Sequence, residues 1–170
     1  MGGASTGAAD DGLGIHRERH VAAARTGFLP YPQRALRTKD FLYIRNFRPD
    51  RWPAGTPDHQ HAFKENAWLA DCDNGPTKEY LWANRDNPAL KRFSDLAFAK
   101  RPAEELYDLS KDPGQINNVA EEADYAVTKK KLAAALMAQL KATKDPRALG
   151  KGKIFDTYPY YGGARPTKPK

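Results

Sequence analysis

Two histidines, His16 and His20, stand four residues apart in the stretch HRERH, with Glu18 between them. On a helix, residues i and i+4 share a face, so the pair could ligate one zinc ion. In the zinc-peptidase pattern HExxH, however, the glutamate directly follows the first histidine, where it can act on a metal-bound water. Glu18 would lie roughly 200° around the helix from His16, and Arg17 and Arg19 would bring positive charge close to any cation. A solvated charged turn is therefore favoured over zinc, and binding of an anion stays open.

Arginines are dense among aromatic residues in the first part of the chain. Guanidinium groups bind tetrahedral oxyanions and carboxylates with two parallel hydrogen bonds, which lysine cannot do. Anion binding is therefore the function that these residues favour, with scattered surface arginines as the alternative. The arginines concerned are Arg17, Arg19, Arg25, Arg34, Arg37, Arg45, Arg48 and Arg51.

Other reactive side chains lack the surroundings that chemistry needs. Asp58, His59 and His61 could bind a metal, but histidines at i and i+2 in a polar loop are usually only solvated. Cys72 is the only cysteine, which excludes an intrachain disulfide and zinc-finger patterns. The sequence contains no GxxxxGK[ST] or GxGxxG loop for phosphate and no GxSxG elbow. The residues alone therefore indicate no self-contained enzyme.

Composition limits the fold and the partners. With 170 residues, 13 glycines, 13 prolines and a mean hydropathy of −0.78, the chain predicts one domain with a small core and long loops. A net charge of +7 favours polyanionic partners. The hypothesis of nucleic-acid binding rests on this charge alone, and the sequence contains none of the recognised nucleic-acid-binding motifs. No apolar stretch approaches the roughly 20 residues that cross a bilayer, so we expect no membrane partner. The N-terminus lacks the basic and apolar regions of a signal peptide.

Two segments predict strands. Aromatic and β-branched residues at 41–44, the apolar pair 35–36 and the polar residues 38–40 between them predict a β-hairpin. Phe41 and Tyr43 would share one face of the second strand and Leu42 and Ile44 the other, which is typical of a covered central strand. A further strand is expected at 105–109, closed by the turn at 111–114.

Helical signals follow the proline-rich loop. Thr77 is expected to cap a short helix that carries Tyr80, Leu81 and Trp82. The clearest helix is expected at 123–143, where leucines repeat every four residues and the Asp–Pro pair at 145–146 ends it. After it, Phe155 and Tyr158 could pack onto the body. The expected fold class is α+β, a small antiparallel sheet with one long amphipathic C-terminal helix packed on it and long loops.

Five collinear blocks resemble the C-terminal third of bacterial sulfatases, closest to the branch similar to heparan N-sulfatase (N-sulfoglucosamine sulfohydrolase). The resemblance covers most of residues 17–163. The blocks are RERH at 17–20, YPQRALRTKDFLYIRNF at 31–47, PDRWPAG at 49–55, GPTK at 75–78 and RPAEELYDLSKDPGQINNVA at 101–120.

The resemblance implies an alkaline-phosphatase-like α/β enzyme whose large N-terminal domain carries the catalytic centre. Its smaller C-terminal subdomain has a four-stranded antiparallel sheet with a helix packed against it. Catalysis in the family uses a cysteine in a CxPxR or CxAxR motif, oxidised to formylglycine, and a calcium ion held by Asp and Asn. Cys72 lacks the proline and arginine of that motif, and Asp10 and Asp11 lack the apolar strand that precedes the calcium ligands. We therefore expect no catalytic residue, calcium or formylglycine in this chain.

The family feature that the resemblance carries over to this chain is a set of residues near the substrate. Family members tend to read GRERH near the mouth of the active site. The resemblance thus implies that Arg17, Arg19 and His20 approach a sulfated sugar or order its pocket. His16 stands where the family usually has glycine.

These expectations define the organisation of the chain. We expect a flexible leader at 1–14, a sulfatase C-terminal subdomain at 15–163 and a disordered tail at 164–170. The chain alone would be inactive, with a missing N-terminal catalytic domain as partner and a sulfated carbohydrate, ester or sulfamate, as substrate. The complete family enzyme is periplasmic or secreted. The alternative is a stand-alone binding module for sulfated glycans or other polyanions. A sheet evolved to contact a larger domain would also expose an apolar face, so the isolated chain should aggregate or dimerise.

Overall fold

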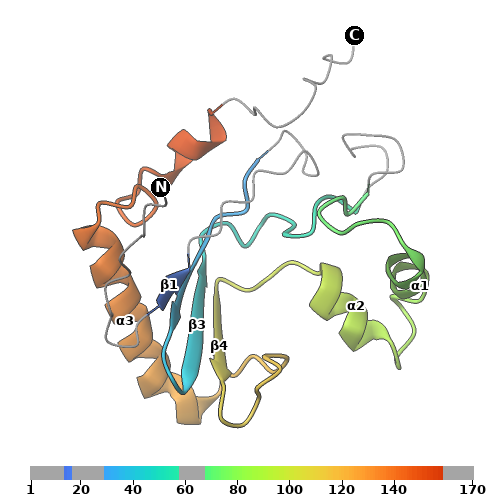
Figure 1. The fold of residues 1–170 in the computed structure, drawn as a ribbon, viewed down its shortest axis with the longest axis horizontal. Helices are drawn as coiled ribbons and strands as arrows, with labels where there is room; N and C mark the ends of the chain where they lie inside the picture. Colours follow the sequence, from blue (N-terminus) through green and yellow to red (C-terminus); the bar gives the residue numbers. More distant parts are fainter. Residues whose placement is uncertain (1–13, 17–28, 58–67, 159–170) are drawn as a thin grey trace, which may run out of the picture.

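The computed structural model describes the backbone of residues 14–16 and the full residues 29–57 and 68–158. Four antiparallel strands form one sheet in the order β1-β2-β3-β4 (Figure 1). The strands are β1 (Gly14–His16), β2 (Gln33–Arg37), β3 (Phe41–Asn46) and β4 (Glu104–Asp108). The expected leader, apart from Gly14, and the expected tail lie outside the described residues. The α+β class expected from the sequence is confirmed.

The predicted hairpin is β2 and β3. Leu36 pairs with Tyr43, and Arg37 pairs with Leu42. Thr38 closes the turn, because its amide donates to the carbonyl of Phe41 at 2.8 Å and its hydroxyl accepts the amide of Phe41 at 3.0 Å. β3 lies between β2 and β4, so the expectation of a central strand is also confirmed.

The long helix α3 (Ala126–Ala142) lies along one face of the sheet, after a 3-10 turn η2 (Ala123–Tyr125). Its leucines are spaced four residues apart and form one buried stripe. Each fully buried leucine stabilises the fold by roughly 1.5–3 kcal/mol. The core between helix and sheet contains Leu36, Tyr43, Leu106, Ala120, Leu132, Leu136 and Leu140. The helix predicted at 123–143 is confirmed.

α3 ends in two backbone bonds typical of a Schellman motif. The amide of Lys144 donates to the carbonyl of Lys141 at 3.0 Å, and that of Asp145 donates to Leu140 at 2.8 Å. Lys144 has φ 56°, a left-handed conformation that glycine adopts more readily. The turn sends the chain back over the sheet with Asp145 buried.

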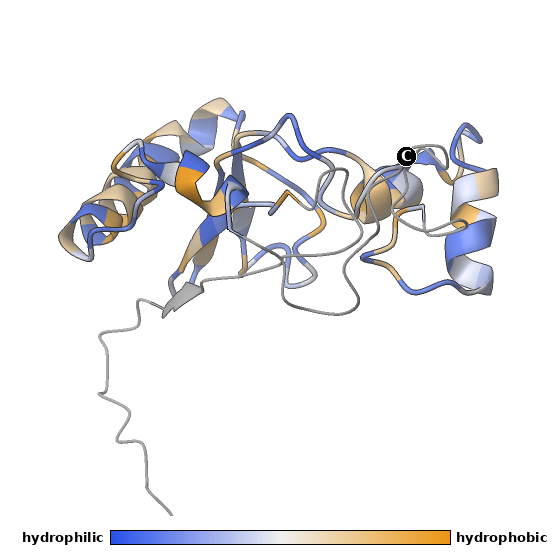
Figure 2. Ribbon diagram, turned by 90° about the horizontal axis from the view of Figure 1, so that it is seen from above, coloured by the Kyte–Doolittle hydropathy of each residue, from blue (hydrophilic) through white to orange (hydrophobic). Residues whose placement is uncertain are grey.

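Two short helices, α1 (Pro76–Ala83) and α2 (Lys91–Phe98), lie on the other side of the sheet from α3, as Figures 1 and 2 both show. They enclose a second apolar cluster built on Ala54, Leu69 and Phe98. The expected cap at Thr77 is wrong. Pro76 occupies the first turn and Gly75 is the N-cap, so no side chain caps the helix, because glycine has no side-chain oxygen to accept the amides of the first turn.

The segment after β4 is held to the sheet by side-chain caps. Asn118 accepts the amides of Leu106 and Ala120 at 2.9 and 3.0 Å, and Asp112 accepts those of Ile116 and Asn117 at 2.8 and 2.7 Å. The predicted strand and its following turn are confirmed, with β4 one residue earlier than expected. Thus the block LYDLSKDPGQINNVA has a structural role in the described fold.

The last described element is the 3-10 turn η3 (Gly152–Asp156). Phe155 is half-buried and meets Tyr158 edge to face at 5.6 Å between ring centroids, while Tyr158 remains 51% exposed. The expected packing onto the body is therefore correct for Phe155 and wrong for Tyr158. Among the described residues, no helix has the length and apolar character needed to cross a bilayer.

Candidate functional site at one end of the sheet

The residues expected to meet substrate, Arg17, Arg19 and His20, lie outside the described residues. The backbone just before them is described. β1 ends at His16, which pairs with Ala35 of β2. The loop residues proposed as alternative metal ligands, 58–61, also lie outside the described part.

One end of the sheet gathers most of the described polar network. Because neighbouring strands are antiparallel, β1 and β3 end where β2 and β4 begin. Gln33 pairs there with Asn46, and Arg45 pairs with Glu104. Arg34 of β2, Arg45 of β3 and the arginines of the loop after β3 therefore lie at the end of the sheet where β1 ends.

Arg34 forms a buried ion pair at this end. Its Nε and Nη2 lie 2.8 and 2.7 Å from Oδ2 of Asp145, and the two side chains are only 7% and 5% exposed. Burial raises the pKa of Asp145, but the Arg147 amide and the Arg34 guanidinium overcome this effect and hold that pKa below its ordinary value. The pair connects β2 to the end of α3 and leaves Arg34 committed within the fold.

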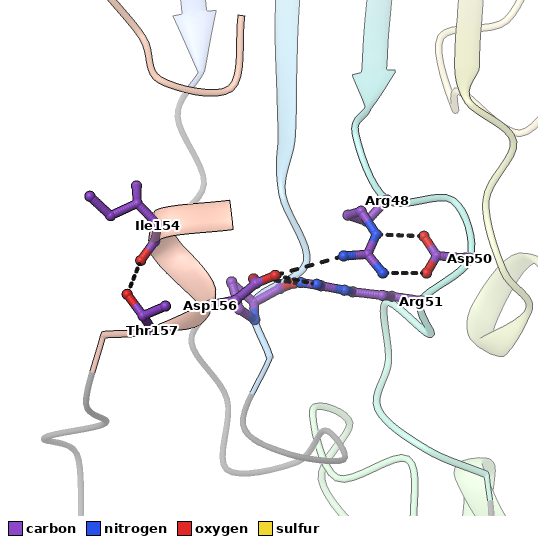
Figure 3. A network of polar contacts seen from close by, with 7 residues as sticks. Arg48, Asp50, Arg51, Ile154, Asp156 and Thr157 are labelled. Atoms are coloured by element: carbon purple, nitrogen blue, oxygen red, sulfur yellow. Dashed lines mark hydrogen bonds and ion pairs between the residues drawn. The ribbon is translucent and has the colours of Figure 1, made fainter. Parts of the chain in front are cut away.

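A second arginine network joins the loop after β3 to η3 (Figure 3). Arg51 donates to Asp156 through Nη1 at 3.0 Å and Nη2 at 2.6 Å, and its Nη1 also donates to the Pro30 carbonyl at 2.7 Å. Arg48 donates to Asp50 at 2.8 Å and 2.5 Å and lies 3.7 Å from Asp156. Hydrogen bonding from Arg51 lowers the pKa of Asp156, and that from Arg48 lowers the pKa of Asp50 to about 2.

Tyrosine and carboxylate side chains pair on both faces of the sheet. Tyr43 donates to Glu104 on the face that α3 covers. On the other face, Tyr107 donates to Glu105 at 2.7 Å, and Asn46 donates to the same carboxylate at 2.6 Å. Burial, together with the neighbouring carboxylate, raises the pKa of each phenol. Both therefore stay protonated at neutral pH and are structural donors.

Most of the described arginines are thus bonded within the fold. Arg34 and Arg51 are buried in ion pairs, and Arg48 is held by Asp50. Arg37 is exposed and fits the picture of a surface arginine, and Arg45 and Arg48 are partly exposed, with Arg45 3.7 Å from Glu104. Arg34 does not contribute to the anion binding expected of this set, because Asp145, 111 residues away in the sequence, neutralises its charge inside the fold.

Cys72 does not have the surroundings of a catalytic nucleophile. Burial raises the pKa of its thiol. Buried Lys78 donates to the backbone carbonyl of Cys72 at 2.8 Å and to Asn74 at 2.9 Å, and lies 4.8 Å from the Trp68 ring centre. Lys78 thereby holds the loop before α1 in place. The residues after Cys72 lack the proline and arginine of the CxPxR motif, so this cysteine does not fit a formylglycine precursor.

The donor set does not fit calcium either. Among residues 14–16, 29–57 and 68–158, no three His, Cys, Asp or Glu side chains are grouped as metal ligands. The carboxylates at the sheet end are taken up by guanidinium groups, which compete with a cation. The described arrangement can position loops and present charge.

Comparison with known proteins adds no assignment. No protein-family model matches this chain. No curated protein matches it either.

Proposed function

We propose that this chain is the C-terminal lobe of a sulfatase and is inactive without a catalytic domain. The observation that carries the proposal is the agreement between the fold and the blocks of resemblance. The block at 31–47 forms the β2–β3 hairpin, and the block at 101–120 forms β4 and its capped turn. A four-stranded antiparallel sheet with a helix packed on it is what the resemblance implies.

The chemistry of the described residues fits a lobe that assists a separate catalytic domain. A sulfatase needs an oxidised cysteine and a calcium site, and the surroundings of Cys72 and of the sheet-end carboxylates fit neither. The catalytic centre would belong to an N-terminal, alkaline-phosphatase-like domain. In this proposal that domain is the partner, and the substrate is a sulfated carbohydrate.

The contribution of this lobe would be to close and shape the active site. In the sequence, the RERH segment directly follows β1, whose last residue, His16, pairs with Ala35 of β2. A rigid sheet would hold the start of that segment at the edge strand. Arg17 and Arg19 would meet the negative charge of the substrate, and His20 would donate to an oxygen of the leaving group.

Exposed aromatic side chains are consistent with a lobe that contacts another domain. Tyr80 on α1 is 58% exposed and Phe93 on α2 is 55% exposed. Exposed apolar surface favours association. We expect the isolated chain to dimerise or aggregate, and a stable monomer in light scattering would weaken the idea of a covered face.

The proposal is tested by assay and by the gene. The purified chain should not hydrolyse an aryl sulfate, with or without calcium, and calcium-dependent turnover would contradict its inactive role. The DNA upstream should encode a CxPxR or CxAxR segment, in frame or in a shifted frame. An upstream region without such a segment would count strongly against the sulfatase assignment.

A further inference from the structure

A shallow groove with a volume of about 510 Å³ runs between α2 and the loop after β4. α2 and the residues next to it form one side, and Ile116 of the loop forms the other. The Nη2 of Arg92 on α2 donates to the Asn117 side chain at 2.8 Å, which joins the two sides. Asp112 holds the loop itself by accepting the amides of Ile116 and Asn117. The groove therefore lies between two segments that are fixed by their own contacts.

Positive charge exceeds negative charge along this groove. Four cationic side chains line it, against a single carboxylate. That carboxylate, Asp95, lies 2.5 Å from Lys91 and neutralises this lysine alone. If the nearby carboxylate of Asp112 is counted as well, although it is outside the lining, two of the four positive charges remain in excess. The cations are Lys91, Arg92, Lys100 and Arg101.

Three of these cations have uncharged partners in the described part of the chain. Lys100 lies over the Trp52 ring, 5.2 Å from its centroid. Arg101 donates to the backbone carbonyl of Leu96. Arg92 has its one contact with the asparagine amide, so its Nε and Nη1 have no acceptor there. These contacts hold the side chains in place without cancelling their charge, and a charge surplus in a concave surface attracts groups of opposite sign.

Apolar side chains separate the charges. Arg92 and Leu96 are four residues apart and share one face of α2. Leu96 and Ala99 line the groove on one side, and Ile116, which is 49% exposed, lines it on the other. Proteins that bind single-stranded nucleic acid stack bases on aromatic side chains, and no described aromatic residue lines this groove. An apolar floor between cations fits instead a peptide whose carboxylates flank an apolar side chain.

We propose that this groove binds a short acidic peptide segment of a partner protein. Carboxylates of the segment meet Arg92 and Lys100, and an apolar side chain between them packs on Leu96 and Ile116. The net charge of +7 attracts the same kind of partner. This site goes beyond the proposed function, because it needs neither the RERH segment nor a catalytic domain. Its success or failure leaves the sulfatase assignment to be decided separately.

Titration of the full chain with four probes tests the proposal. The first is a short peptide of glutamates interrupted by two leucines. In the second peptide lysines replace the glutamates, in the third serines replace the leucines, and the fourth probe is a single strand of thymidine nucleotides. We expect saturable 1:1 binding of the glutamate–leucine peptide by calorimetry, weakening as salt rises. The other three should each bind at least about tenfold more weakly, because they lack the negative charge, the apolar contacts or an aromatic platform for their bases.

Two matched pairs of variants locate the site. Arg92→Glu changes the groove, whereas Arg37→Glu makes the same charge change on an exposed residue outside the lining. Ile116→Ser removes apolar surface from the groove, whereas Val127→Ser removes it from a residue that is 82% exposed elsewhere. All four side chains are exposed, so the variants should fold like the parent chain.

The variants in the groove should weaken binding of the glutamate–leucine peptide more than their controls do. We expect a loss of about tenfold or more for Arg92→Glu and about threefold or more for Ile116→Ser. Each control should change binding by less than about twofold. Equal losses within either pair, equal binding of the lysine or serine peptide, tighter binding of the thymidine strand or no saturable binding would each overturn the proposal.

Discussion

Replacing Arg34 with methionine should strongly destabilise the fold. Arg34 and Asp145 are almost fully buried, at 7% and 5% side-chain exposure, and two guanidinium nitrogens lie within 2.8 Å of one carboxylate oxygen. Removing one partner leaves the other charge buried, which typically costs about 3–5 kcal/mol. A domain has only about 5–15 kcal/mol of stability in total. Arg34→Met should therefore remain folded only marginally.

Urea unfolding followed by circular dichroism measures this loss. With a slope of about 1–3 kcal/mol per molar urea, a loss of about 3 kcal/mol lowers the midpoint by roughly 1–3 M. Arg37→Met is the matched control, because Arg37 is exposed on the same strand. The control should change the free energy of unfolding by less than about 0.5 kcal/mol.

The double variant Arg34→Met with Asp145→Leu separates pairing from burial. It leaves no unpaired charge, so its loss should be smaller than the sum of the two single losses by about 2–3 kcal/mol. The effect should also depend on pH. Since the pKa of Asp145 is lowered in the fold, the ion pair stabilises the folded chain at pH values above the ordinary aspartate pKa of about 4. The difference in unfolding free energy between the parent chain and Arg34→Met should therefore shrink as the pH falls below that value. Strict additivity of the two single losses would refute the reasoning.

Three further changes follow from the described contacts. Leu136→Ala should lower the free energy of unfolding by about 3–5 kcal/mol, because Leu136 is fully buried between α3 and the sheet. A loss below about 1 kcal/mol in urea unfolding would show that the helix packs elsewhere. Lys144→Gly should raise the melting temperature, with a gain of about 0.5–1 kcal/mol, because φ 56° is strained for lysine, and a lower melting temperature would contradict the left-handed turn. Hydrogen bonding from Ser110 lowers the pKa of Asp108 to about 2, so the contribution of this carboxylate to stability is present above about pH 4 and is lost as pH falls toward 2. Ser110→Ala should therefore flatten the dependence of unfolding free energy on pH in that window. An unchanged pH dependence would show that the hydrogen bond does not stabilise the fold.

Elements with a strong local period were predictable from the sequence. Leu132, Leu136 and Leu140 fix one face of α3, and the β-branched and aromatic run at 41–44 marks β3. Both signals depend on neighbours in sequence, which is why the sheet-and-helix class could be predicted without the structure. The block at 101–120 predicted β4 and its turn for the same reason.

α2 was not predicted, although its polar and apolar residues separate onto two faces. Only Ser94 and Phe98 are buried within it, and Phe93 points an aromatic side chain to solvent. Ser94 donates to the Leu81 carbonyl at 2.8 Å, a tertiary contact that no local pattern reveals. The start of α1 at Pro76 was predictable from the sequence, because proline is favoured at the first position of a helix and Thr77 then lies inside the first turn.

The arginine pairing could not be read from the sequence. Arg34 meets Asp145 across 111 positions and Arg51 meets Asp156 across 105, so the partners become neighbours only when α3 folds back on the sheet. The density of arginine near 34–51 suggested an external anion, whereas much of that charge is neutralised inside the fold.

Co-expression tests the central claim most directly. The catalytic segment expected upstream should be expressed alone and together with this chain, and hydrolysis of an aryl sulfate measured in both. The account predicts substantial activity only when both parts are present, and loss of that activity when Arg17 and Arg19 are changed to alanine in this chain. Full activity of the upstream segment without this chain would contradict the account.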